Sequence, residues 1–111
     1  MRVWESSHVF ALSTYKALEQ FPKIEQYALV DQIRRAVVSI PSNIAEGCGR
    51  SSDKDFLRFL SIALGSANES EYQLYLAFQL GYINADAWQS LEEQVNTIKK
   101  MLITFLNKLQ K

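Results

Sequence analysis

The chain has 111 residues, 48% of them apolar and 22% charged, with 12 basic and 12 acidic side chains and no formal net charge. This length and composition predict one globular domain over residues 1–111, and they exclude a disordered chain or a strongly basic nucleic-acid coat protein. A single cysteine excludes an internal disulfide, and no apolar run approaches the roughly 18 residues of a membrane span, so we expect a soluble cytoplasmic protein without a signal peptide.

Helical periodicity predicts a first helix over about residues 3–20. The side chains expected on its buried face are Trp4, His8, Ala11, Tyr15 and Leu18. A second helix is expected to begin near Ile24 or Glu25 and to end at Gly47 and Gly49. Pro41 removes one backbone donor, so we expect a kink between Val37 and Pro41. The apolar stripe of this second helix comprises Leu29, Ile33, Ala36, Ile40 and Ile44.

A third helix is expected from Ser51, Ser52 or Asp53 to about Gln79, closed by Gly81. Its buried face comprises Phe56, Phe59, Leu60, Ala63, Ala67, Leu74 and Ala77. A fourth helix is predicted over residues 84–109, with Asn84 or Asp86 as its N-cap. Its stripe repeats at alternating steps of three and four residues: Trp88, Leu91, Val95, Ile98, Leu102, Phe105 and Leu109.

Four helices with short connections predict an all-α, antiparallel up-down-up-down four-helix bundle with a kinked second helix. The short first helix leaves part of the long helices uncovered, which predicts a homo-oligomer. Gly65 costs about 1 kcal/mol relative to Ala inside a helix, and close approach of another backbone would offset that cost. The residues proposed for subunit contacts are Gly65, Ser66, Met101, Ile103 and Leu106.

Charge is segregated along this neutral chain. Residues 34–58 carry a net charge of +2, residues 69–93 carry −5 without any Lys or Arg, and residues 99–111 carry +4. Four of the five arginines fall within residues 34–58. The overall neutrality therefore conceals local fields that an oligomer would repeat.

The most distinctive stretch is residues 32–50, QIRRAVVSIPSNIAEGCGR, and it supports two interpretations. In the first, the polar stripe through Arg35, Ser39, Ser42 or Asn43, and Glu46 is structural and pairs internally or with a neighbouring helix. Its structural motif comprises Pro41, Asn43, Glu46 and Gly47. In the second, which spacing alone favours less, a basic patch faces phosphates. That patch comprises Arg34, Arg35, Arg50, Lys54 and Arg58.

Catalytic and metal chemistry find little support in the sequence. Glu5 and His8 have the spacing of di-iron bundles, but one histidine cannot complete such a site within the chain. Cys48 has only His8 as a candidate base. Glu69 and Glu71 lie on different helix faces. Four aromatic residues could stack nucleic-acid bases but are more typical of a core or a subunit contact: Tyr72, Tyr75, Tyr82 and Trp88.

The run over residues 32–50, followed by DFLRFLSIALGSANESEYQL and LGYI, resembles the bacterial four-helix bundle proteins known as 23S rRNA intervening-sequence proteins. Trp4 and Phe21-Pro22 also match that family's pattern, and the resemblance covers about residues 2–83. The chain departs from the family's GSxxELE pattern at Ser70.

This resemblance implies a homopentameric four-helix bundle from a family whose genes occur within insertions in bacterial large-subunit rRNA genes. The accessory proteins of diversity-generating retroelements are similar in fold, assembly and nucleic-acid binding, but they are markedly basic, whereas this chain is neutral. We therefore weigh a non-enzymatic RNA-associated protein against a homo-oligomeric scaffold with no nucleic-acid role. Neither hypothesis requires a cofactor, a membrane or a small-molecule substrate.

Overall fold

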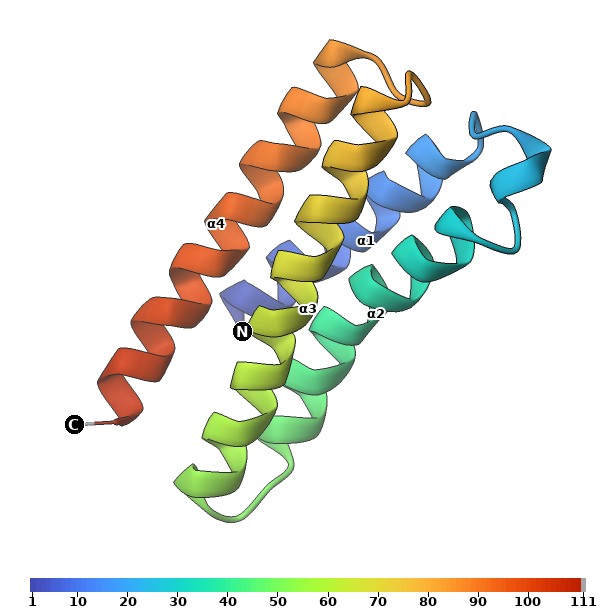
Figure 1. Cartoon of the computed structure of the whole chain (residues 1–111). Coiled ribbons are helices and arrows are strands. Elements are labelled where there is room, and N and C mark those ends of the chain that lie inside the picture. The colour runs from blue at the N-terminus through green and yellow to red at the C-terminus, as the bar shows by residue number, and fades with distance from the viewer. Residues whose placement is uncertain (111) are drawn as a thin grey trace.

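The computed structural model describes residues 1–110, which form four α-helices and no β-strand (Figure 1). The helices are α1 (Arg2–Leu18), α2 (Leu29–Cys48), α3 (Asp53–Gln79) and α4 (Ala85–Leu109). Successive helices run antiparallel, and α1 packs against both α2 and α4. In the described chain, no Cα atoms of the diagonal pairs α1/α3 and α2/α4 approach within 8 Å. This arrangement confirms the predicted up-down-up-down bundle, a rod of 44 × 24 × 18 Å.

The apolar stripes predicted for α2, α3 and α4 form the core. All five stripe residues predicted for α2 are buried, and Ile33, Ile40 and Ile44 are completely inaccessible to solvent. In α4 the central stripe residues Leu91, Val95, Ile98 and Leu102 are buried, while those near its ends are half-buried. The 3.6-residue repeat identified these faces because each long helix places one apolar side against its neighbours.

The face predicted for α1 is partly wrong. Ala11 and Leu18 are buried as expected, but Trp4, His8 and Tyr15 lie at the surface. The buried face instead includes Ser7 and Thr14, whose hydroxyls donate to the backbone carbonyls of Trp4 and Phe10, each at 2.8 Å. Hydroxyls satisfied within their own helix can enter a core at little cost, and hydropathy alone does not detect them.

The predicted start of the second helix is also wrong. Lys23–Glu25 form a separate 3₁₀ turn, η1, and α2 begins only at Leu29 because the backbone of Ala28 is non-helical (φ −120°, ψ −101°). The Tyr82 hydroxyl donates to Glu25 Oε2 at 2.8 Å, so η1 is tied to the α3–α4 connection. This hydrogen bond to Glu25 is the main cause that raises the pKa of Tyr82 above its ordinary value.

The helix boundaries follow local signals. Ser52 accepts a hydrogen bond from the Asp55 N–H at 3.2 Å, and Asn84 accepts one from the Ala87 N–H at 2.8 Å, so Asn84 rather than Asp86 caps α4. Gly81 closes the α3–α4 connection with a φ of +82°, a conformation that favours glycine.

The helix α2 continues through Pro41, and the kink there stays a prediction. None of the described helices has the length and apolar character that crossing a bilayer requires.

We expect Gly47→Ala to lower the free energy of unfolding by about 1–3 kcal/mol, because overpacking strains a filled interface. A Cβ at Gly47 would lie 2.9 Å from Phe56 Cδ1 and 3.0 Å from Phe59 Cβ. Urea denaturation at one fixed protein concentration measures the change. Gly49→Ala is the matched control, because its Cβ would meet only Glu46 O at 3.6 Å. Equal losses for both variants would contradict this account.

Candidate functional site

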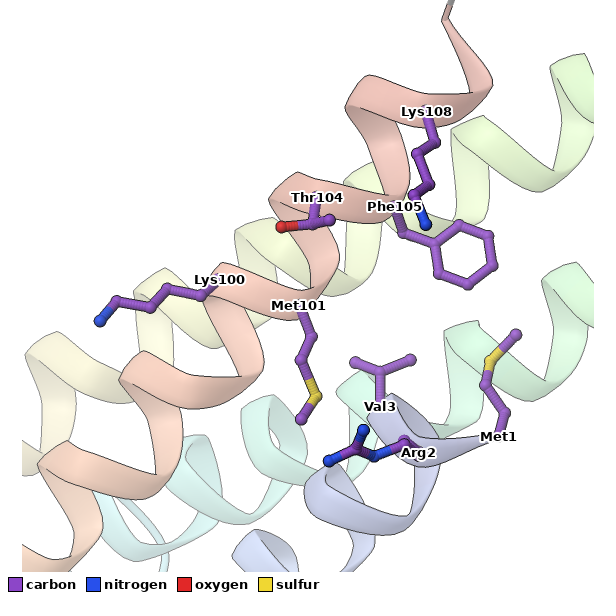
Figure 2. Close-up of a pocket in the computed structure, with 8 residues that line it drawn as sticks. All are labelled: Met1, Arg2, Val3, Lys100, Met101, Thr104, Phe105 and Lys108. Carbon is purple, nitrogen blue, oxygen red and sulfur yellow. The ribbon is translucent and has the colours of Figure 1, made fainter.

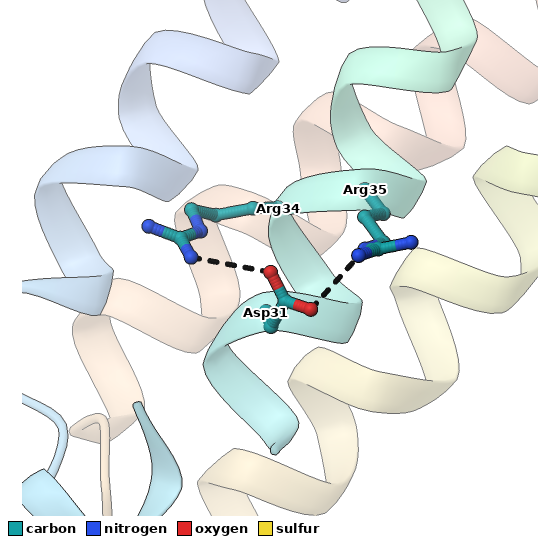
Figure 3. Close-up of polar contacts among 3 residues, drawn as sticks. All are labelled: Asp31, Arg34 and Arg35. Atoms are coloured by element: carbon teal, nitrogen blue, oxygen red, sulfur yellow. Dashed lines mark hydrogen bonds and ion pairs between the residues drawn. The ribbon is translucent and has the colours of Figure 1, made fainter. Parts of the chain in front are cut away.

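Two of the predicted phosphate-binding residues share one carboxylate near the start of α2. Arg34 Nη2 donates to Asp31 Oδ1 and Arg35 Nε donates to Asp31 Oδ2, each at 3.2 Å (Figure 3). Their positions three and four residues after Asp31 bring both guanidinium groups to the same acid. The Arg35 side chain is 80% exposed and that of Arg34 is 38% exposed. We call this pair the Arg34–Arg35 cluster.

The other three predicted phosphate-binding residues lie around the α2–α3 connection. Arg50 Nη2 donates to Glu46 Oε1 at 2.8 Å, and Arg58 Nε lies 3.9 Å from Asp55 Oδ1. Both guanidinium groups also sit over the Phe59 ring, at 4.9 and 4.5 Å from its centroid. Lys54 is exposed and forms no ion pair with any residue of 1–110. We call Arg50, Lys54 and Arg58 the turn cluster.

These cations therefore form two groups rather than one continuous group. At about 1.5 Å per residue, about 24 Å of helix axis separates Arg34 from Arg50. Every ion pair that their arginines form joins residues three or four positions apart in sequence. The carboxylates of Asp53 and Glu69 do not pair with these arginines in the described structure, whereas that of Glu46 does.

The polar stripe of α2 is satisfied partly across the α2–α3 interface. Asn43 Nδ2 donates to the backbone oxygen of Ser39 at 2.8 Å and to its hydroxyl at 2.9 Å. The Ser39 hydroxyl lies 2.8 Å from the Ser66 hydroxyl on α3. Asn43 thus binds the turn that contains the half-buried Pro41, while Ser66 joins this network to the next helix. Arg35 and Glu46 take no part, because each pairs within its own exposed turn.

The residues proposed for subunit contacts occupy different environments. Gly65 is exposed and a Cβ there would meet no atom within 4 Å, so no neighbour within the described chain explains it. Ser66 is half-buried against Ser39, and Leu106 is buried in the chain's own core. Leu106 is buried because it lies on the core-facing side of α4, so it is not available for a subunit contact. Ile103 is 46% exposed and Met101 is half-buried.

The candidate catalytic residues are not assembled into a site. His8 stacks on Trp4 with ring centroids 5.3 Å apart, whereas the Cys48 thiol lies 4.0 Å from Met1 Sδ. No group of three or more metal-binding side chains of His, Cys, Asp or Glu occurs within residues 1–110. Glu71 pairs with Lys99 of α4 and therefore has a structural contact.

The predicted aromatic set divides into two environments. Tyr82 packs on Phe21, with centroids 5.3 Å apart, and so stabilises the η1 end of the bundle. Tyr75 and Trp88 contact each other at 5.6 Å on the outer surface of α3 and α4. Together with four further residues they line a shallow hollow of about 250 Å³. We call this surface the acidic–aromatic patch; it comprises Asn68, Glu71, Tyr72, Tyr75, Trp88 and Glu92.

Sequence reasoning missed a groove between the start of α1 and the C-terminal half of α4. It encloses about 530 Å³, and Figure 2 shows Val3, Met101 and Phe105 as its apolar floor with Arg2 and Lys108 beside them. The net charge of +4 over residues 99–111 was the available signal, but the contribution of Arg2 required the fold. We call it the end groove; its lining is Met1, Arg2, Val3, Lys100, Met101, Thr104, Phe105 and Lys108.

Comparisons with known proteins agree with this architecture. The family model of the 23S rRNA-intervening sequence protein matches residues 1–104. A crystal structure from Bacteroides thetaiotaomicron, of a protein with unknown function from the S23 ribosomal protein family, is similar with a TM-score of 0.85. That protein is 34% identical, and the similarity covers 94% of this chain and 97% of the other. No protein with curated function matches the sequence.

We expect Ser39→Ala and Ser66→Ala each to lower the free energy of unfolding by about 0.5–1.5 kcal/mol, because each removes the hydrogen bond between α2 and α3. The double variant should lose less than the sum of the single losses, because both serines contribute to one interaction. Chemical denaturation measures this coupling. The control is Ser42→Ala on the exposed side of α2, which should change stability by less than about 0.5 kcal/mol. Strict additivity would contradict the shared interaction.

Proposed function

This chain belongs to the 23S rRNA-intervening sequence protein family, and from that premise we propose that it is a non-enzymatic, homo-oligomeric protein that binds RNA. The observation that carries the proposal is that the side chains of Arg34, Arg35, Arg50 and Arg58 stay 38–80% exposed although each pairs with an acid three or four residues away. The rRNA context in the family's name supports RNA as the polyanion and the bacterial cytoplasm as its location.

Exposed ion pairs of this kind leave the arginines available to phosphates. A pair three or four residues apart on a solvated helix contributes only about 0.3–0.5 kcal/mol, and salt weakens it further. A phosphate can therefore replace the carboxylate at small cost, particularly at Arg35 with its 80% exposed side chain. Arg50 and Arg58 also lie over the Phe59 ring, and this cation–π contact favours the surface positions of both guanidinium groups.

Self-association would compensate for the neutral charge of one chain. Each copy adds its Arg34–Arg35 cluster and turn cluster, so an oligomer multiplies the local positive field without changing the net charge per chain. Exposed apolar side chains support self-association: Leu12 is 58% exposed and Tyr15 is 45% exposed on α1, and Ile103 is exposed on α4. The family resemblance makes a pentamer our specific proposal, with Gly65, Ser66, Met101 and Ile103 as contact candidates.

The alternative function is a homo-oligomeric scaffold without a nucleic-acid role. The observation that favours it is that each of these four arginines already has a carboxylate within ion-pair distance. The two functions differ in one consequence. If the acids only hold the arginines in place for a structural purpose, removing an acid weakens folding and creates no affinity for RNA.

We expect Arg34→Ala combined with Arg35→Ala to weaken RNA binding and to reduce the slope of log affinity against log salt by up to about 2. Asp31→Asn should have the opposite effect and strengthen binding, because it frees both guanidinium groups without removing them. Fluorescence anisotropy with a labelled single-stranded RNA, measured over a series of salt concentrations, tests both. Lys16→Ala, at an exposed cation outside both clusters, is the control. Affinity unchanged in all variants would support the scaffold instead.

We expect multi-angle light scattering at micromolar concentration to give the mass of several copies, with five as the specific expectation. Gly65→Gln should reduce this mass without unfolding the chain, because the space around Gly65 is open within one copy. A wild-type monomer would remove the assembly proposal. An unchanged mass for Gly65→Gln would remove only Gly65 from the contact.

A further inference from the structure

The end groove exists because α1 is shorter than its neighbour α4. The helix α1 has 17 residues and α4 has 25, and the C-terminal turns of α4 extend past the first residues of α1 (Figure 1). The Phe105 ring packs edge-on against the Phe56 ring, with centroids 5.4 Å apart, and this contact holds Phe105 in the floor of the groove. The floor is therefore a built apolar surface that no segment of residues 1–110 covers.

The groove combines this apolar floor with positive charge. Arg2, Lys100 and Lys108 line it, and none of them forms an ion pair within the described part of the chain. Figure 2 shows the Arg2 guanidinium beside Met101 and the Lys108 ammonium beside Phe105. The complementary occupant must present apolar or aromatic side chains together with carboxylates. RNA phosphates alone would leave the apolar floor without a partner.

The acidic–aromatic patch has this complementary chemistry. Tyr72 is 62% exposed and Tyr75 is 44% exposed beside Trp88, so the patch offers aromatic rings to a partner. Glu92 lies among them and forms no ion pair with another described residue, and residues 69–93 contain no Lys or Arg. One chain thus carries both halves of a charge-complementary apolar contact.

The two surfaces cannot meet within one copy. The patch reaches the middle of α4, where its Glu71 pairs with Lys99 beside the groove-lining Lys100, but about 25 Å of helix axis separates Trp88 from Phe105, so the aromatic rings of the patch stay away from the apolar floor of their own groove. Building on the self-association proposed above, we propose that the acidic–aromatic patch of one copy docks into the end groove of the next. This contact joins two different surfaces, so repetition must close into a ring or continue as a filament.

The apolar contacts and the opposite charges of this proposed interface have different physical roles. Burial of the Tyr72 and Tyr75 rings against Met101 and Phe105 supplies most of the affinity, because exposed ion pairs contribute little. The opposite charges set the orientation of docking and repel copies that approach groove to groove or patch to patch. The proposed contact explains why a chain without net charge carries acidic and basic side chains in separate segments. Because salt screens the attraction between them, we expect assembly to weaken as the salt concentration rises.

Charge reversal tests the contact in the full-length chain. One variant carries Lys100→Glu and Lys108→Glu in the groove; a second carries Glu69→Lys, one turn from Tyr72, and Glu92→Lys in the patch. Light scattering should show that each variant alone has a lower mass than the wild type. An equimolar mixture should regain a higher mass than either variant alone, because every contact between the two variants joins opposite charges; alternation satisfies all contacts of an open or even-numbered assembly and four of the five contacts of a pentameric ring. Circular dichroism checks that both variants remain helical.

The control is Lys16→Glu with Lys23→Glu, which makes the same charge change at exposed cations outside the groove and should keep the wild-type mass. A wild-type oligomer whose mass neither reversal changes would overturn the docking proposal but leave self-association intact. A monomeric wild type would overturn both. Variants that dissociate but do not recover on mixing would overturn the pairing of these two surfaces. A groove variant that keeps its mass but loses RNA binding would assign the groove to RNA instead.

Discussion

The unequal lengths of the helices constrain every other feature of this bundle. Helices α3 and α4 have 27 and 25 residues, while α1 has 17, so α1 covers only part of the surface that its neighbours present. Where α1 covers it, the stripe of α4 is buried, as at Ile98. Where α1 has not yet begun, Phe105 remains half-buried and the end groove opens. The difference in length between α1 and α4 therefore decides which part of α4 is buried in the core and which part forms the end groove, the surface that we propose binds a second copy.

Charge in this protein acts locally rather than through the net total. The arginines of α2 and the α2–α3 connection pair with acids one turn away, as Arg50 does with Glu46. Such pairs hold the side chains at the surface without burying them, so the desolvation penalty of a buried ion pair does not arise. Arg2, Lys100 and Lys108 of the end groove pair with no acid of residues 1–110. The arginines of the two clusters can therefore exchange one anion for another, whereas the cations of the groove are available to a first partner.

The misassigned face of α1 shows how hydropathy and burial can disagree. Trp4 and Tyr15 are large and apolar, yet they lie at the surface, where Trp4 stacks on His8. Ser7 and Thr14 are polar, yet both are completely buried because each hydroxyl donates a hydrogen bond to a backbone carbonyl of α1 itself. Small side chains at these positions allow α1 to pack closely against the bundle beside the fully buried Phe10, while the rings of Trp4 and Tyr15 lie at the surface. The exposed apolar residues of α1 thus follow from the packing of its opposite side.

The sequence by itself determined the four helices apart from the start of α2, the buried stripes of α2, α3 and α4, and the turn at Gly81, because these depend on residues within one or two turns of each other. It offered Asn84 and Asp86 as caps of α4, and the structure selected Asn84. Only the tertiary structure decided which side of α1 faces inward, that Lys23–Glu25 form a separate turn, and that Leu106 belongs to the core. It also placed Arg2 and Lys108 on the same groove and separated the Arg34–Arg35 cluster from the turn cluster. The physical reason is that periodicity reports how apolar a face is, whereas the lengths and relative positions of the helices decide which neighbour covers that face.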